Sequence, residues 1–266
     1  MTMAEQAIDF TNPCSLFKYR AFDQYAIQTL IDGKIWLADP KSFNDPFDCM
    51  CYIDRKHSDE ELLAHLNDCA QSRGDTRQFT LEDIPQERLD YERGLDELEE
   101  GVRNAGIFCL AATPFEPLMW AHYADGHRGF CIEYERRADN DLGSTGCSWV
   151  TYDDPTFPVF RGLDYFRQGK DMLQRILTHK ARSWDYEHEW RLMRMWKGSP
   201  GERSYRLNAR ILSITFGIRM PRRDELTIIR ILRHLTGIKY YKMAVIQGRL
   251  ALQQHPFHFP EEELDA

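Results

Sequence analysis

The chain has 266 residues, of which 42% are hydrophobic and 29% are charged, and its formal net charge is −8. This length allows a sizeable hydrophobic core, in one large domain or two small ones. The negative charge disfavours binding to long nucleic acids, which requires an extended basic surface. No apolar run approaches the roughly 20 residues that span a bilayer, so we expect no membrane partner.

Cellular location and cysteine use are the next properties that the sequence limits. Residues 1–12 lack the basic start and apolar segment of a secretory signal, so we expect a cytoplasmic protein. The seven cysteines are scattered, and their odd number argues against a disulfide framework. Cys49 and Cys51 form a C-x-C pair, but no second pair has zinc-finger spacing. We therefore expect buried free thiols and no bound metal.

The first half of the chain predicts two strands followed by a helical region. A strand over residues 16–19 precedes a helix that Asp23 caps and Gly33 ends, and a second strand covers 34–38. Residues 40–48 form a loop dense in Pro, Asn and Asp. Ser58 and Glu61 form a capping box for one helix, and a second helix covers about 82–103. We interpret residues 57–104 as a helical insertion within a single domain, 1–266.

The second half predicts most of a β-sheet. Strands are expected over 106–112, 128–135 and 148–152, with a short helix over 117–123. A long helix over 163–182 precedes a strand that the glutamates at 187 and 189 lead and that runs to about 196. Residues 203–207 and 211–216 are further strands, followed by a helix over 221–237 and two short strands. Because strands and helices mix without strict alternation, the fold class is α+β with a mainly antiparallel sheet.

Two segments before residue 50 carry candidate binding residues. Lys18, Tyr19 and Arg20 place two cations around a tyrosine, which suits a phosphate group and a stacked ring. An ordinary exposed sheet edge would have the same composition. Asn44 and Asp45 precede a proline, where their side chains commonly cap a turn, although an acidic side chain in this loop could also contact a ribose.

Two later segments carry candidate catalytic residues. Trp120 and Tyr123 lie three apart and share one face of the expected helix, with His122 between them; a purely structural role is the alternative. Glu187 and Glu189 alternate with Arg191 along the expected strand, so all three side chains point to one face. Paired carboxylates can divide the stabilisation of an oxocarbenium-like centre and a proton transfer. A salt-bridged strand edge explains the same spacing.

The segments FKYR, FNDPFD, WAHYADGHRGFCIEY and WDYEHEWR, in this order, resemble a large bacterial family known only as domain of unknown function 2971. A more distant resemblance links their layout to ADP-ribosyltransferases. Members of that group have a basic or histidine residue on a first strand, an aromatic segment in mid-chain and E-x-E leading a later strand. The resemblance implies a split antiparallel sheet that binds NAD in its cleft.

The resemblance also implies a role for each matched residue. Glu189 would be the catalytic glutamate, and Glu187 would orient or deprotonate the acceptor. Tyr19 and Tyr123 would stack on nicotinamide or adenine, and Arg20 with Lys18 would contact the pyrophosphate. The remaining implied site residues are His122 on the catalytic side, with Asn44, Asp45, Trp120 and Arg191 on the NAD-binding side. In the context of the other segments, Arg191 is better interpreted as a structural partner of Glu189.

This sequence departs from the transferase pattern, because Lys18 and Arg20 compete for the first position and the usual serine-threonine-serine strand is missing. The leading hypothesis is an NAD-dependent ADP-ribosyltransferase-like enzyme, such as a toxin or phage-defence effector. It would transfer ADP-ribose to a protein or nucleic acid or hydrolyse NAD. One alternative is a nuclease or other hydrolase that uses His122, His127, Asp45 and Glu189. Another is a non-catalytic binding module.

Overall fold

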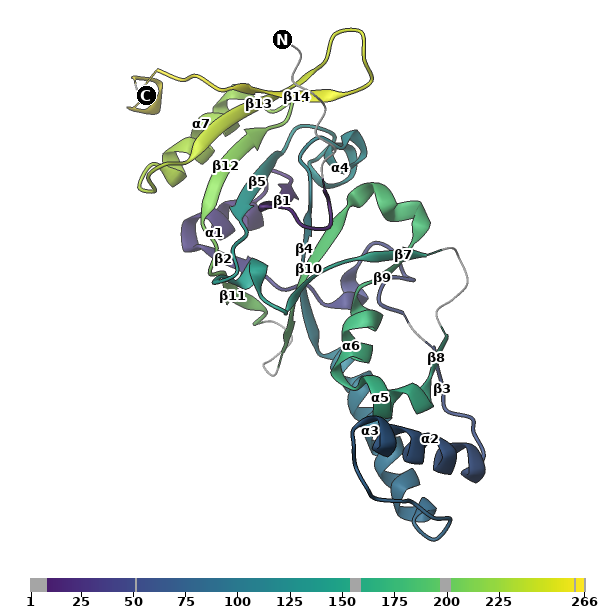
Figure 1. The fold of residues 1–266 in the computed structure, drawn as a ribbon. Coiled ribbons are helices and arrows are strands. Elements are labelled where there is room, and N and C mark those ends of the chain that lie inside the picture. The colour runs from purple at the N-terminus through teal and green to yellow at the C-terminus, as the bar shows by residue number, and fades with distance from the viewer. Residues whose placement is uncertain (1–8, 51, 154–158, 197–201, 261, 266) are drawn as a thin grey trace.

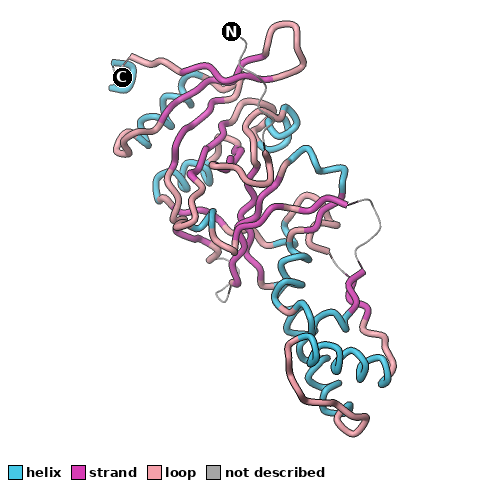
Figure 2. Tube along the Cα trace, in the orientation of Figure 1, coloured by secondary structure: helices cyan, strands magenta, loops and turns pink. Residues whose placement is uncertain are grey.

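The structure is a computed structural model that describes residues 9–50, 52–153, 159–196, 202–260 and 262–265. One large sheet forms the body of the molecule, and a mostly helical arm extends from it (Figures 1 and 2). The sheet runs in the order β14-β13-β12-β5-β1-β4-β10-β6, and only the β12–β13 pair is parallel. The predicted α+β class with a mainly antiparallel sheet is therefore confirmed.

The strands of the large sheet are mostly five to seven residues long. They are β1 (Ser15–Arg20), β4 (Ala105–Ala111), β5 (Phe130–Glu135), β6 (Cys147–Trp149), β10 (Glu189–Met195), β12 (Ile211–Phe216), β13 (Lys239–Val245) and β14 (Leu252–Pro256). Three two-stranded pairs accompany it: β2 (Lys34–Trp36) with β11 (Ser204–Arg206), β3 (Tyr52–Asp54) with β8 (Val159–Arg161), and β7 (Thr151–Asp153) with β9 (His179–Ala181).

The large sheet is opened between β1 and β4. All six residues of β1 are in register with β5, whereas β1 and β4 share a single registered pair, Phe17 with Ala111. Beyond that pair the edge of β4 is taken by Ala38, whose backbone exchanges two hydrogen bonds with Ile107. The two strands therefore diverge from one point, and side chains of both border the space between them.

Each face of the sheet has its own core, because strand side chains alternate. The main core packs one face against α1 (Gln24–Asp32) and α7 (Arg222–Leu232), with Leu16, Ile132 and Trp190 at its centre. A smaller cluster on the other face packs Tyr19 and Met243 against α4 (Pro117–Tyr123). The side chains of β1 thus contribute to both cores.

The helical arm consists of α2 (Asp59–Ser72), α3 (Ile84–Arg103), α5 (Tyr165–Gln168) and α6 (Lys170–Leu177), together with the β3–β8 pair. These elements share a hydrophobic cluster that includes Leu62, Leu95 and Met172. The arm is strongly acidic: residues 58–103 hold 14 acidic and 5 basic residues, in a chain with 42 and 34. Residues 58–103 alone therefore carry a net charge of −9, and the rest of the chain, at +1, is nearly neutral.

Several local signals act as the sequence predicts. The Asp23 side chain accepts a hydrogen bond from the Ala26 amide, and Gly33 ends α1 in the left-handed conformation, with φ of 63°. Ser58 and Glu61 form the reciprocal hydrogen bonds of a capping box at α2. The short elements η1 (Pro40–Ser42), η2 (Asp141–Gly143), η3 (Gly162–Asp164), η4 (Arg182–Glu187) and α8 (Glu262–Asp265) complete the described fold. No helix in these ranges is long and apolar enough to cross a bilayer.

Two predicted elements are wrong, and both affect the site. The single helix over 163–182 is broken at Gly169, which has φ of 49°, and ends at Leu177, whose carbonyl accepts a hydrogen bond from Arg191. The chain then forms the short strand β9 instead of a further helical turn. Glu187 does not lie on the same strand as Glu189: it ends the 3-10 helix η4, and His188 turns the chain with φ of 44°.

Candidate functional site

A cavity of about 390 Å³ occupies the opening between β1 and β4. Its volume lies within the range of small-molecule sites. Strand residues from both sides border it, together with the loop that follows β2, the helix α4 and the start of β10. Lys18 reaches across the opening, and its Nζ donates a hydrogen bond to the Cys109 carbonyl at 2.7 Å.

Glu187 and Glu189 border this cavity from one side. The left-handed turn at His188, rather than strand alternation, brings the two carboxylates to the same place. The aromatic ring of Phe10 stacks on His188 at 3.8 Å, which supports this turn. Only 2% of Glu187 and 3% of Glu189 is exposed. Burial of two carboxylates is costly unless cations and hydrogen bonds compensate it.

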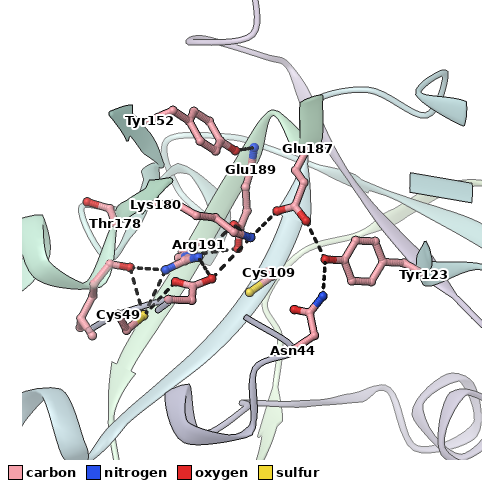
Figure 3. Close-up of polar contacts among 12 residues, drawn as sticks. Asn44, Cys49, Cys109, Tyr123, Tyr152, Thr178, Lys180, Glu187, Glu189 and Arg191 are labelled. Carbon is pink, nitrogen blue, oxygen red and sulfur yellow. Dashed lines mark hydrogen bonds and ion pairs between the residues drawn. The ribbon is translucent and has the colours of Figure 1, made fainter. Parts of the chain in front are cut away.

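Lys180 and Arg191 supply that compensation (Figure 3). The Lys180 ammonium contacts Glu187, lies 3.0 Å from Oε2 of Glu189 and lies 3.4 Å from Asp48. Arg191 donates two hydrogen bonds to Glu189, at 2.9 and 3.0 Å, and a third to Asp48 at 2.7 Å. Three carboxylates thus share two cations in a buried network, which keeps the two glutamates in fixed positions.

This network separates the pKa values of the two glutamates. Burial raises the pKa of Glu187, and the negative charge of Glu189 raises it further. Burial acts on Glu189 in the same direction, but Arg191 and Lys180 outweigh it and hold the pKa of Glu189 well below its usual range. Burial disfavours the charged form of Lys180, yet the three carboxylates raise the pKa of its ammonium. Such a divergence is the pattern expected when two carboxyl groups have different chemical tasks.

Tyr123 connects Glu187 to the mouth of the cavity. Its hydroxyl donates a hydrogen bond to Oε1 of Glu187 at 2.6 Å and accepts one from the Asn44 amide at 3.3 Å. Burial and the adjacent carboxylate both raise the pKa of the Tyr123 phenol, so it remains a hydrogen-bond donor. Tyr152 supports the other glutamate, because its hydroxyl accepts a hydrogen bond from the Glu189 amide at 2.8 Å.

The structure brings most of the predicted site residues to this one cavity. Those that border it are Lys18, Tyr19, Arg20, Asn44, His122, Tyr123, Glu187 and Glu189. Tyr19 borders the cavity, but its side chain is held in place: the ring packs edge-on against Trp120, and the hydroxyl donates a hydrogen bond to the Thr113 carbonyl at 2.8 Å. Its aromatic face is therefore part of the core.

Three predicted binding residues do not border the cavity. Trp120 is fully buried and donates its indole hydrogen bond to the Pro114 carbonyl, so it is a core residue. Asp45 accepts a hydrogen bond from the Phe47 amide and caps the turn around Pro46. Arg191 has no exposed surface and forms an ion pair with Glu189. This agrees with its interpretation as a structural partner of Glu189.

Lys180 and Trp36 also border the cavity, but they are not among the site residues that the sequence predicts. Lys180 was assigned to a continuous helix, which hid its position on β9. Trp36 lies on the predicted strand 34–38, where no neighbouring residue indicates a binding or catalytic role. The prediction of buried free thiols is confirmed for Cys49, Cys69, Cys131 and Cys147, whereas the free thiols of Cys14 and Cys109 are exposed and partly buried, respectively. Cys51 lies outside the described residues. Within the described ranges, no three His, Cys, Asp or Glu side chains are grouped so that they could hold a metal ion.

Part of the chain that borders the site is similar to a known sequence family. Residues 119–192 match the model of the family described as "Protein of unknown function (DUF2971)". The match includes His122, Tyr123, Lys180, Glu187 and Glu189, whereas the residues of β1 that border the cavity lie outside it. No curated protein and no solved structure matches the chain.

Proposed function

We propose that this chain is an NAD-dependent ADP-ribosyltransferase-like enzyme. The observation that carries the proposal is the pair of buried glutamates with opposed pKa shifts, beside a cavity in an opened antiparallel sheet. The same cavity is bordered by Lys18 and Arg20, which supply positive charge for the two phosphates of NAD. A dinucleotide requires only such a local cationic wall, so the net charge of −8 does not count against it.

The proposed reaction breaks the bond between the ribose C1′ and the nicotinamide nitrogen. The electron pair of that bond leaves with nicotinamide and neutralises its ring, while positive charge develops on the ribose. Glu189, which its two cations keep ionised, would stabilise this charge and accept a hydrogen bond from a ribose hydroxyl. The acceptor then forms a bond to C1′, and its proton passes to Glu187, whose raised pKa suits a general base.

Among the other hypotheses, the hydrolase alternative requires His122, His127, Asp45 and Glu189 in one place. His122 and Glu189 border the cavity, but His127 and Asp45 do not. The His127 ring instead stacks over Trp120, with 6.3 Å between the ring centroids. The geometry therefore favours glycosidic chemistry at the two glutamates over that combination.

The test is release of nicotinamide from NAD by the full chain, followed by chromatography, with and without a cell extract that supplies macromolecular acceptors. We expect Glu189→Gln to slow release by about 100-fold or more. We expect Glu187→Gln to slow transfer to the acceptor by about 100-fold or more. The matched control is Glu225→Gln, because Glu225 is also buried and paired with a lysine, Lys242, but lies outside the cavity.

The proposal is wrong if the native chain neither binds NAD nor releases nicotinamide. A non-catalytic binding module would bind NAD without turnover, and both glutamine variants would then behave alike. Circular dichroism of each variant checks that loss of activity does not result from unfolding.

A further inference from the structure

Trp36 is an exposed aromatic residue at the edge of the cavity. On β2 the side chains alternate, so Ile35 points into the main core and Trp36 points away from it, with 49% of its surface exposed. Exposure of so large an apolar ring to water is unfavourable. A ring of this kind beside a cavity is a natural surface for a flat ligand group.

Three other aromatic side chains around the cavity, those of Tyr19, Tyr123 and Phe108, are less able to stack on a ligand. The ring of Tyr19 packs in the core, and the hydroxyl of Tyr123 is held between Glu187 and Asn44. Phe108 is only 5% exposed, and the Lys18 ammonium lies over its ring at 4.9 Å. Trp36 is half exposed and therefore offers more free ring surface than these three residues.

The cations of β1 border the same part of the site as Trp36. A small second cavity adjoins the first and is bordered by Trp36, Arg20 and Lys18, but not by either glutamate. Burial lowers the pKa of Lys18, and Glu187 and Glu189 are close enough for their negative charges to oppose part of that effect. The border of the site thus runs from the carboxylates, through Lys18, to Arg20 and Trp36.

We infer that Trp36 binds the heteroaromatic base of the ligand by stacking, next to phosphate groups that Lys18 and Arg20 contact. This inference rests on the proposed function, in which the base is the adenine of NAD. The sequence of carboxylates, cations and aromatic ring matches the sequence of ribosyl centre, diphosphate and adenine in that molecule. Trp36 is then a specificity residue that acts on binding rather than on bond cleavage.

Binding measurements with three probes test this assignment. Isothermal titration calorimetry on the full chain gives the Kd of NAD, of ADP-ribose, which retains the adenine, and of nicotinamide mononucleotide, which lacks it. Stacking of a base on an aromatic ring contributes about 1–3 kcal/mol, so Trp36→Leu should weaken binding of NAD and ADP-ribose by roughly 5- to 150-fold. Binding of nicotinamide mononucleotide should change less than about twofold.

Two further variants make the result specific. Trp36→Phe retains a ring and should recover most of the lost affinity. Tyr52→Leu removes another aromatic residue, 52% exposed but outside the cavity, and should leave all three Kd values unchanged. For NAD turnover, Trp36→Leu should raise KM and leave kcat nearly unchanged.

The possible failures are distinguishable. Equal Kd values for NAD in the native chain and in Trp36→Leu would overturn the assignment of Trp36 and leave the proposed reaction intact. Equal weakening of NAD and nicotinamide mononucleotide would also overturn it. If the native chain binds ADP-ribose through Trp36 but releases no nicotinamide, the stacking site stands and the proposed reaction falls. If it binds none of the probes, both are wrong.

Discussion

Removal of the Lys180 ammonium is the sharpest test of the buried charge network. Lys180→Met would leave Asp48, Glu187 and Glu189 with Arg191 as their only remaining cation in the network, although each of the three carboxylate side chains is at most 5% exposed. Loss of one partner from a buried ionic group typically costs about 3–5 kcal/mol, because the remaining charge is uncompensated. We expect a loss of that size in the free energy of unfolding at pH 7, measured by urea denaturation with circular dichroism.

The buried carboxylates also determine how this loss of stability depends on pH. Burial already raises the folded-state pKa of Glu187, and loss of Lys180 raises it further, so Glu187 binds its proton more tightly in the folded variant than in the unfolded chain. Stability of the variant then falls as pH rises from about 5 to 8, and its deficit relative to the native chain is smallest at the acidic end.

Lys242→Met is the matched control for this substitution. It removes a lysine that is 28% exposed and paired with one buried carboxylate, Glu225, so we expect a smaller loss. The reasoning is refuted if Lys180→Met costs less than about 1 kcal/mol, the value typical of an exposed pair. A deficit that is identical at pH 5 and pH 8 would refute it as well.

Four other predictions follow from single contacts. Tyr123→Phe removes a hydrogen bond to the Glu187 carboxylate, which is worth about 1.5–3 kcal/mol. The acid limb of the pH profile for ADP-ribose transfer to the acceptor should therefore move upward by about 1 pH unit or more, and an unchanged profile would contradict this. Because the pKa of Glu187 is raised by folding, its ionisation costs stability as pH rises through the folded value. The Tm of Glu187→Gln should consequently fall less between pH 5 and pH 7 than the native Tm, and calorimetry at the two pH values checks it. Gly129→Ala would place its Cβ 2.0 Å from the Arg20 carbonyl oxygen and should cost at least about 1–3 kcal/mol, whereas Gly101→Ala, which meets the flexible side chain of Leu173 at 3.3 Å, should cost less in the same denaturation assay. Finally, iodoacetamide should label the exposed Cys14 much faster than Cys49, which is buried and has a raised pKa; equal rates in peptide mapping would show that Cys49 is accessible.

Local sequence signals predicted the elements that depend on neighbouring residues. Asp23 with Gly33, and Ser58 with Glu61, determine helix ends through contacts within one or two turns, so their spacing is visible in the chain. The buried strand at 105–111 was recognisable as an unbroken apolar run between polar turns. The same type of pattern placed Lys18, Tyr123 and Glu189 on elements that converge on one cavity.

The parts that the sequence did not predict depend on contacts between distant residues. The helix before residue 178 ends where Arg191, fourteen positions later, bonds the Leu177 carbonyl, and no periodicity in residues 163–182 encodes that contact. The turn at His188 depends on stacking with Phe10, which lies near the N-terminus and far from His188 in the sequence. The hydrogen-bond partners of Glu187, Tyr123 and Lys180, likewise come from two separate segments, so its spacing from Glu189 alone could not give its environment.

The single registered pair between β1 and β4 has a further consequence for how this protein can change in evolution. This pair joins a group of five strands, from β14 to β1 in the order of the sheet, to a group of three, β4, β10 and β6. The width of the cavity is then set by the twist of the sheet, which the two hydrophobic cores maintain, and not by the lengths of the surrounding loops. Insertions and substitutions in the loop that carries Asn44 can alter what enters the cavity without rebuilding its walls. Diversification of ligand choice on a constant scaffold is the expected outcome of such an arrangement.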